Sequence, residues 1–154
     1  MTREGRVAEI RNCNIPDDLY YLVRSHVWAR PEGDLVVVGL TDVAQNLAKR
    51  FIAYTPRRVG KSVEVSKSTA TLESGKWVGP VPAPVAGEIV AINESAQADP
   101  SIVNRDPYGE GWIVKVKAVD WSRDSAGLLT GQAALDEYTT FLTEEGIVCE
   151  AAAS

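Results

Sequence analysis

Residues 68 to 84 read Ser68-Thr69-Ala70-Thr71-Leu72-Glu73-Ser74-Gly75-Lys76-Trp77-Val78-Gly79-Pro80-Val81-Pro82-Ala83-Pro84. The first six residues alternate and are rich in threonine, which predicts a strand, and Ser74-Gly75 provides turn chemistry. We therefore expect a hairpin with Lys76 at its tip, projecting into water. A lysine has a nucleophilic amine on a flexible stem, which suits covalent attachment of a cofactor that must travel. An isolated lysine in a turn is most often a solvated surface residue. The surrounding sequence must therefore distinguish such a residue from a cofactor attachment site.

The residues after Lys76 indicate how open this hairpin is. Proline cannot donate a hydrogen bond to a strand ladder, so Pro80, Pro82 and Pro84 favour an edge strand or one that is only partly paired. Neighbouring backbone would then not crowd the tip. Trp77 has two interpretations of equal weight: a surface platform for a bound ring or a partner, or an ordinary packing residue.

The rest of the chain reads mainly as short strands. Strand signals dominate between Val23 and Val119, with glycine or proline between them, which is typical of a sandwich or barrel. Residues 42 to 49 predict a brief helix within this region, with Thr41 or Asp42 as its cap.

A second helix is predicted from Gly131 onward. One apolar stripe that can dock on the sheet recurs there at helical spacing. Its members are Leu135, Tyr138, Phe141 and Leu142. Residues 93 to 105 are polar and contain Pro100, and for them we expect a loop with a short helical turn.

Six stretches spread over residues 17 to 145 carry a family resemblance. In chain order they are Ser25-His26-Val27-Trp28, Val38-Gly39-Leu40-Thr41-Asp42-Val43-Ala44-Gln45, Glu73-Ser74-Gly75-Lys76, Pro84-Val85-Ala86-Gly87-Glu88-Ile89-Val90, Ile102-Val103-Asn104 and Asp106-Pro107-Tyr108-Gly109-Glu110-Gly111-Trp112. Together they resemble the lipoyl-carrying H-proteins of the glycine cleavage system and, more distantly, the lipoyl and biotinyl domains. The resemblance implies that Lys76 is joined by an amide bond to lipoic acid.

The resemblance also implies a fold and its subdivision. The expected fold is mainly β, a lipoyl/biotinyl-type barrel-sandwich hybrid with a short helix after the first strands and a C-terminal helix. We expect an N-terminal extension over residues 1–16, the β domain over 17–122, a helical segment packed on it over 123–146, and a tail over 147–154.

The same resemblance places further residues near the lipoyl site. Glu73, before Ser74 and Gly75, is expected to help the attaching enzyme recognise the turn, with a structural hydrogen bond as the competing role. Ser25 and His26 match the family's cleft. For His26, the only histidine, we favour a structural hydrogen bond over proton transfer.

Two departures from the H-protein pattern concern the cargo. In that family, carboxylates in a cleft hold the cationic amine of an aminomethyl cargo; here Val27 and Pro80 stand at those positions. One hydroxyl, that of Ser25, cannot replace the attraction of two carboxylates for an ammonium group. An aminomethyl cargo would therefore be poorly protected.

A further departure concerns docking. Where the family is usually acidic, this chain is basic, with Glu64 as the one opposing acid. The basic residues are Lys49, Arg50, Arg57, Arg58, Lys61 and Lys67. Because charge complementarity governs encounter and partner choice, we interpret this as a docking surface of changed sign, serving a different enzyme set; the alternative is a solvated face without a partner.

Composition bounds the remaining possibilities. With 154 residues, 45% of them hydrophobic, the chain is expected to form one domain. No apolar run is long enough to span a bilayer, and residues 1 to 6 lack an apolar signal core, so we expect a cytoplasmic protein with no membrane partner. A net charge of −5 argues against binding to nucleic acid.

The two cysteines are interpreted as unpaired thiols. Cys13 and Cys149 fit no metal spacing, and a bridge between them is a minor alternative.

Three functions are compatible with these patterns, none of them enzymatic. The run from Glu73 to Pro80 resembles the H-protein-like lipoate-binding proteins of the heterodisulfide-reductase-like sulfur-oxidation system, and this implies a swinging arm on Lys76 that shuttles sulfur-bound intermediates and electrons. The first alternative is a glycine cleavage H-protein that moves an aminomethyl group. The second is an unlipoylated scaffold.

These functions imply different partners. A sulfur carrier would meet a heterodisulfide-reductase-like complex, and a glycine cleavage carrier would meet glycine decarboxylase, aminomethyltransferase and dihydrolipoyl dehydrogenase. Either carrier would need a lipoate-attaching ligase or a lipoyl synthase system. The resemblance further implies a monomer.

Overall fold

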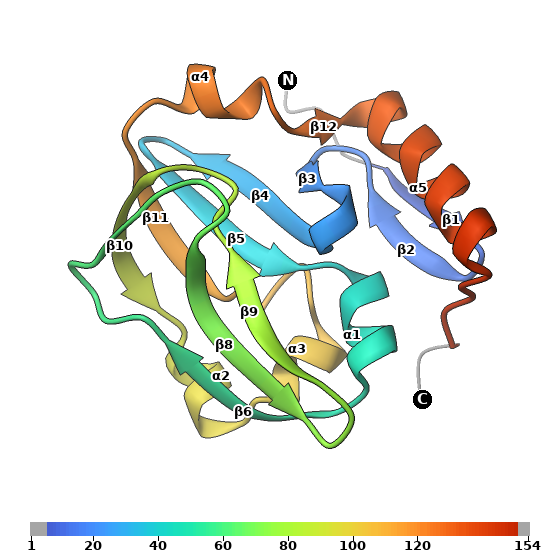
Figure 1. The fold of residues 1–154 in the computed structure, drawn as a ribbon, viewed down its shortest axis with the longest axis horizontal. Coiled ribbons are helices and arrows are strands. Elements are labelled where there is room, and N and C mark those ends of the chain that lie inside the picture. The colour runs from blue at the N-terminus through green and yellow to red at the C-terminus, as the bar shows by residue number, and fades with distance from the viewer. Residues whose placement is uncertain (1–5, 151–154) are drawn as a thin grey trace.

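Two antiparallel sheets packed face to face form the centre of the computed structural model, which describes residues 6–150 (Figure 1). The larger sheet has the order β12 (Leu129–Thr130), β3 (Tyr20–Leu22), β4 (Val27–Glu32), β5 (Leu35–Leu40), β11 (Val114–Ala118), β10 (Gly87–Ile92) and β7 (Ser62–Val63). The smaller sheet has the order β6 (Phe51–Pro56), β8 (Ser68–Ser74) and β9 (Val78–Pro82). The expectation of a mainly β fold with a C-terminal helix is confirmed.

Side chains alternate between two cores on the two faces of the large sheet. Val36 and Val38 of β5 join the cluster between the sheets, where they meet Leu72 of β8. Val37, between them, points to the opposite face and joins a second cluster with Tyr138. This alternation is the two-residue period of a strand that is covered on both faces.

Helix α5 (Gly131–Glu145) covers the second face, as the apolar stripe predicts. It buries Ala134, Tyr138 and Leu142, while Leu135 and Phe141 are partly buried against the same cluster. Beside it lies a small hairpin of β1 (Val7–Ile10) and β2 (Cys13–Pro16) (Figure 1). These strands precede the region where strand signals dominate the sequence. Residues 1–5 and 151–154, the ends of the expected extension and tail, lie outside the described residues.

Helix α1 (Asp42–Ala48) confirms the brief helix predicted after the first strands. Thr41 is its cap: the Thr41 hydroxyl accepts a hydrogen bond from the Ala44 N–H at 3.3 Å. A capping side chain satisfies a backbone donor that the first helical turn leaves free.

The segment from 93 to 105 is more helical than predicted. It forms α2 (Glu94–Ala98) and α3 (Ile102–Arg105), with Pro100 between them, in place of a loop with one turn. Buried Asn93 is the reason, because its side-chain oxygen accepts from Ser95 N while its amide donates to the Glu110 and Trp112 carbonyls. A further short helix, α4 (Trp121–Ser125), precedes β12, and a 3₁₀ turn, η1 (Val23–Ser25), precedes β4.

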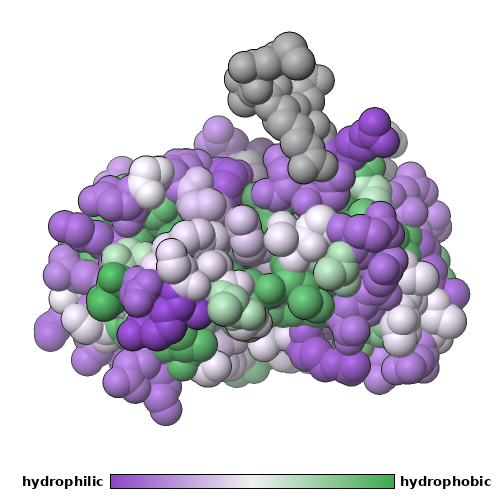
Figure 2. All heavy atoms as spheres, turned by 90° about the horizontal axis from the view of Figure 1, so that it is seen from above, coloured by the Kyte–Doolittle hydropathy of each residue, from purple (hydrophilic) through white to green (hydrophobic). Residues whose placement is uncertain are grey.

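Two observations concern the outer surface. Among the helices of residues 6–150, none has both the length and the apolar character needed to cross a membrane. Figure 2 views the molecule from the end opposite to the β8–β9 turn, and there hydrophobic residues form small groups between hydrophilic ones.

Candidate functional site: a lysine turn beside an apolar cleft

The turn that bears Lys76 is organised by one hydroxyl group. Ser74 N donates to the Trp77 carbonyl at 2.7 Å, which closes a two-residue turn of Gly75 and Lys76. The Ser74 Oγ accepts from the backbone N–H of Lys76 at 3.2 Å and of Trp77 at 3.0 Å. Serine side chains in turns satisfy such backbone donors locally. The hairpin predicted from the sequence is confirmed, and hydrogen bonds to the Ser74 hydroxyl stabilise its tip.

Lys76 is exposed at this tip, and its neighbours leave it free. An added Cβ at Gly75 would meet nothing within 4 Å, so the space around the turn is open. Glu73 is exposed, and within residues 6–150 its carboxylate makes no hydrogen bond or ion pair, so the structural bond considered for it is not seen. Glu73 and Gly75 are therefore exposed to solvent beside Lys76.

Strand β9 is an edge strand, as its prolines predict. In the described part of the chain it pairs with β8 alone, from Glu73↔Val78 to Ser68↔Pro82. Trp77 folds back on this strand: a Cβ at Gly79 would lie 2.2 Å from the indole ring. Its side chain packs on the hairpin and remains 40% exposed; a role as a platform for a bound ring or a partner stays a prediction.

An apolar cleft of about 220 Å³ lies next to this edge strand. Its lining is Ser25, His26, Leu40, Ala44, Leu47, Ala48, Phe51, Trp77 and Pro80. The structure thus gathers Ser25, His26 and Trp77 around one hollow, as expected, and places Pro80 there too. The contribution of Leu40 and Phe51 was not foreseen; their apolar character marks them as core residues, and nothing in the sequence says that they reach a cleft.

One wall of the cleft comes from α1 and the turn before β4. Residues at the spacing of one helical face, Ala44, Leu47 and Ala48, line it. His26 ends η1 in the left-handed conformation with φ of 57°, and its carbonyl accepts from Thr41 N at 2.9 Å. The backbone of this turn is therefore tied directly to the cap of α1.

The His26 side chain does not make the hydrogen bond expected of it. Its buried Nδ1 has no partner in the described part of the chain. The ring instead packs against α5, with centroid distances of 6.5 Å to Tyr138 and 5.3 Å to Phe141. Burial lowers the His26 pKa to about 4, so the imidazole is neutral near pH 7.

Among residues 6–150, no carboxylate lines the cleft. Of the two positions where the H-protein pattern has acids, Pro80 lines the hollow, whereas Val27 is fully buried in the core between the sheets. In this chain the Val27 side chain therefore contributes to packing and does not line the cleft. With neutral His26 and the Ser25 hydroxyl as its polar groups, the cleft offers no counter-charge to a cation.

The six basic residues do not form one surface around the lysine. Strand β6 starts beside the turn, where Phe51 pairs with Ser74, and ends where Arg57 N donates to the Thr69 carbonyl. Six residue steps along the strand separate Phe51 from Arg57, about 20 Å at about 3.3 Å per residue. Lys49 and Arg50 precede β6 near the turn; Arg57, Arg58, Lys61 and Lys67 lie at the far end. The six residues thus form two groups on the small sheet, and the docking surface of changed sign stays a prediction.

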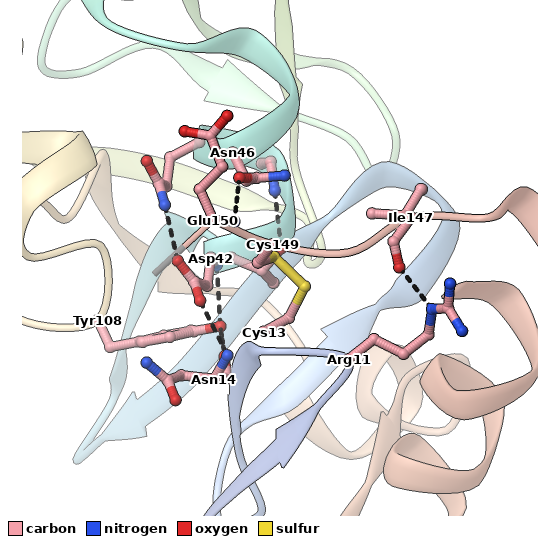
Figure 3. Close-up of a disulfide and its surroundings, with 12 residues drawn as sticks. Arg11, Cys13, Asn14, Asp42, Asn46, Tyr108, Ile147, Cys149 and Glu150 are labelled. Carbon is pink, nitrogen blue, oxygen red and sulfur yellow. Dashed lines mark hydrogen bonds between the residues drawn. A yellow bond between two sulfur atoms is a disulfide. The ribbon is translucent and has the colours of Figure 1, made fainter. Parts of the chain in front are cut away.

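The two cysteines form a disulfide, which corrects the interpretation as free thiols (Figure 3). Cys13 and Cys149 are 136 residues apart, but their Cα atoms lie 5.0 Å apart. The fold brings β2 and the segment after α5 to the same side of α1, a juxtaposition that spacing alone cannot reveal. Both cysteines are buried in the second core cluster.

Comparisons with known proteins agree on one family. A family model described as "Glycine cleavage H-protein" matches residues 19–142. Glycine cleavage system H protein 5 of Aquifex aeolicus is 44% identical over 147 residues, which cover 93% of this chain and 99% of that protein. Probable glycine cleavage system H protein 2 of Sulfurisphaera tokodaii is 42% identical, with coverages of 94% and 99%.

A solved structure matches as well. The crystal structure of a glycine cleavage system H protein from Mycobacterium marinum superposes with a TM-score of 0.70 at 32% identity. The match covers 86% of this chain and all of that one. The two proteins are therefore similar in both sequence and fold.

Proposed function

This chain belongs to the glycine cleavage H-protein family, and we propose that it holds the family's lipoic acid as an amide on Nζ of Lys76. Proteins of this family are carriers without catalytic activity of their own, and they bear lipoic acid covalently on a lysine. The bound group supplies a cyclic disulfide that accepts electrons and a substrate group together. The observation that carries the assignment is an exposed lysine at a two-residue turn next to an apolar cleft.

The residues around Lys76 suit the attached group. The Ser74 hydroxyl fixes the turn, so the amine is presented to an attaching lipoate ligase in one geometry. The cleft lies beside the same hairpin, and its walls of Leu47, Phe51 and Trp77 match an aliphatic chain and a sulfur ring. A rigid hairpin keeps the arm available and raises its local concentration at each partner.

For the cargo, we propose an aminomethyl group taken from glycine and passed between the enzymes of glycine cleavage. The names of the similar proteins, all glycine cleavage system H proteins, support this choice. Glycine decarboxylase, aminomethyltransferase and dihydrolipoyl dehydrogenase would then be the partners. The role of this chain would be to expose Lys76 to these enzymes and to bind the lipoyl arm in the cleft beside Trp77.

A second candidate cargo is a sulfur-bound intermediate. The absence of a carboxylate from the cleft favours it, because a neutral apolar hollow suits an uncharged cargo better than an ammonium group. The names of the similar proteins number them 5 and 2 within their organisms, which is consistent with more than one H-protein per organism. Such a carrier would serve a heterodisulfide-reductase-like complex.

Loading by glycine decarboxylase tests the proposal. We expect lipoylated protein, incubated with glycine and the enzyme, to gain the aminomethyl mass in an intact-mass spectrum. We also expect Pro80→Asp to lengthen the lifetime of that gain, because a carboxylate at the rim of the cleft attracts the amine. Pro80→Ser is the matched control, since it removes the proline without adding charge.

The other outcomes have defined meanings. A lipoylated chain that never gains the mass, with or without Pro80→Asp, would favour the sulfur cargo. In Lys76→Ala either carrier loses all transfer. Full partner affinity in that variant, combined with no lipoylation of the native chain, would leave only a scaffold.

A further inference from the structure

Helix α1 separates the apolar cleft from a second, polar hollow. This polar cavity has a volume of about 710 Å³, and the α1 residues that line it are Asp42, Gln45 and Asn46. Its other lining residues are Asn12, Asn14, Lys49, Arg50, Asn104, Arg105, Asp106, Pro107, Tyr108 and Glu150. Asn12, Asn14 and Glu150 are the sequence neighbours of the two disulfide-bonded cysteines. The disulfide therefore holds together two of the segments that bound this cavity (Figure 3).

Most walls of the cavity are fixed without help from the disulfide. The Tyr108 hydroxyl accepts from Asp42 N at 2.9 Å and donates to the Asn14 carbonyl at 2.5 Å. The Asn104 side chain accepts from Phe51 N at 2.9 Å and donates to the Lys49 carbonyl at 2.7 Å. These bonds tie β2, α1 and the segment after α3 to one another.

The wall formed by residues 147–150, which we call the strap, is held differently. It has no regular secondary structure, and its noncovalent ties are few. Ile147 N donates to the Leu142 carbonyl at 2.9 Å, and Ile147 packs against the second core cluster. Cys149 N donates to the Arg11 carbonyl at 3.0 Å, Arg11 Nε donates to the Ile147 carbonyl at 2.7 Å, and Glu150 N donates to Asn46 Oδ1 at 2.9 Å. Single hydrogen bonds at such positions stabilise weakly, and the disulfide is the covalent restraint on the end of the strap.

The strap also sets the charge of the cavity. Glu150 Oε1 lies 3.0 Å from Lys49 Nζ, with the two side chains 77% and 45% exposed. With the strap in place the lining holds three cations, Lys49, Arg50 and Arg105, and three carboxylates, Asp42, Asp106 and Glu150. Without the strap three cations face two carboxylates.

We propose that the Cys13–Cys149 disulfide is a redox latch, whose reduction frees residues 147–150 from α1, opens the polar cavity and leaves its lining net positive. The reductant is a dithiol: when the strap opens transiently and exposes the buried disulfide, one thiolate attacks a sulfur, the S–S bond breaks, and the second thiol resolves the mixed disulfide. Two electrons and two protons pass to the cysteines, and the dithiol becomes a cyclic disulfide. The proposal does not depend on which cargo the arm carries.

Hydrogen exchange of the whole chain, before and after treatment with dithiothreitol, tests this latch. We expect two alkylatable thiols after treatment, and exchange at least about 10-fold faster at the amides of Cys149 and Glu150, since each loses its hydrogen-bond partner. At the same labelling times of seconds, β4 and β5 should stay protected. Cys13→Ser/Cys149→Ser should reproduce this pattern without reductant.

A matched variant separates the latch from the ion pair. Glu150→Gln removes the carboxylate and keeps the disulfide, so its strap amides should exchange as in the native oxidised chain. Unchanged strap exchange in a chain with two free thiols would overturn the latch. So would simultaneous loss of protection in β4 and β5 at these labelling times, which would mean that reduction unfolds the whole chain, or a disulfide that dithiothreitol cannot reduce in the folded chain.

Discussion

Single side chains decide the geometry of the lysine turn. Ser74 is buried within an otherwise exposed tip, and its hydroxyl alone satisfies two backbone donors. The sequence predicts a turn at Ser74-Gly75 but not which of the two residues holds the turn in place. In the structure the serine does so through its hydroxyl, whereas a side chain at position 75 would meet open space.

The turn serine should therefore be sensitive to substitution. Ser74→Ala leaves the N–H groups of Lys76 and Trp77 without their acceptor, and we expect a loss of about 1 kcal/mol in the free energy of unfolding. Urea unfolding measures it. Thr71→Ala, an exposed position on the same strand, is the control and should change stability much less. Equal losses in the two variants would contradict the role given to the Ser74 hydroxyl.

His26 should make stability depend on pH. Its folded pKa of about 4 lies below the usual 6.5, so between these values the unfolded chain binds a proton that the folded chain does not. Stability should fall as pH drops from about 7 to about 4, by about 3 kcal/mol from this residue. Urea unfolding at both pH values should show a smaller fall in His26→Gln. An identical fall in the variant would contradict a buried, neutral imidazole.

At the scale of elements, the hairpin and α1 form the site together. The prolines of β9 predict an edge strand, and the pattern of residues 42 to 49 predicts a helix; both predictions are confirmed. That the helix turns Ala44 and Leu47 toward the hairpin follows from packing between segments distant in sequence. No local pattern contains that information.

Two glycines of the hairpin form a matched pair for testing the place of Trp77. Gly79→Ala puts a Cβ 2.2 Å from the indole, so the ring must move, whereas Gly75→Ala adds a Cβ in open space at a residue whose φ is not positive. We expect Gly79→Ala to lower the melting temperature by a few degrees and to shift the Trp77 indole resonance in an NMR spectrum. Gly75→Ala should do neither. If Gly79→Ala changed neither the melting temperature nor the indole resonance, the Trp77 indole would not lie against Gly79.

At the scale of the whole molecule, the disulfide joins the first hairpin to the segment after α5. The sequence gives two cysteines and no sign of their proximity, because the contact arises only when both ends of the chain reach α1. The six basic residues show the converse case. They are close in sequence, yet β6 carries them to opposite ends of the small sheet. Distance along the chain predicts distance in space poorly once strands are extended.

The disulfide should stabilise the whole chain as well as the strap. It closes a loop of 136 residues, and restricting an unfolded chain to that extent contributes about 5 kcal/mol in the loop-entropy account. We expect Cys13→Ser/Cys149→Ser to unfold at lower urea concentration by a free-energy difference of about 3 to 5 kcal/mol. The native chain kept in reductant should match the variant. An oxidised chain no more stable than the variant would contradict this contribution.

Peptide mapping of the lipoylated protein tests the assignment of Lys76 most directly. The chain is incubated with a lipoate ligase, lipoic acid and ATP, and digested for mass spectrometry, beside Lys76→Arg and the control Lys67→Arg in the bend before β8. We predict one lipoyl group per chain, on the peptide that contains Lys76, in native and Lys67→Arg protein, and none in Lys76→Arg. A lipoyl group on another lysine, or unmodified Lys76 in folded protein under these conditions, would contradict the assignment.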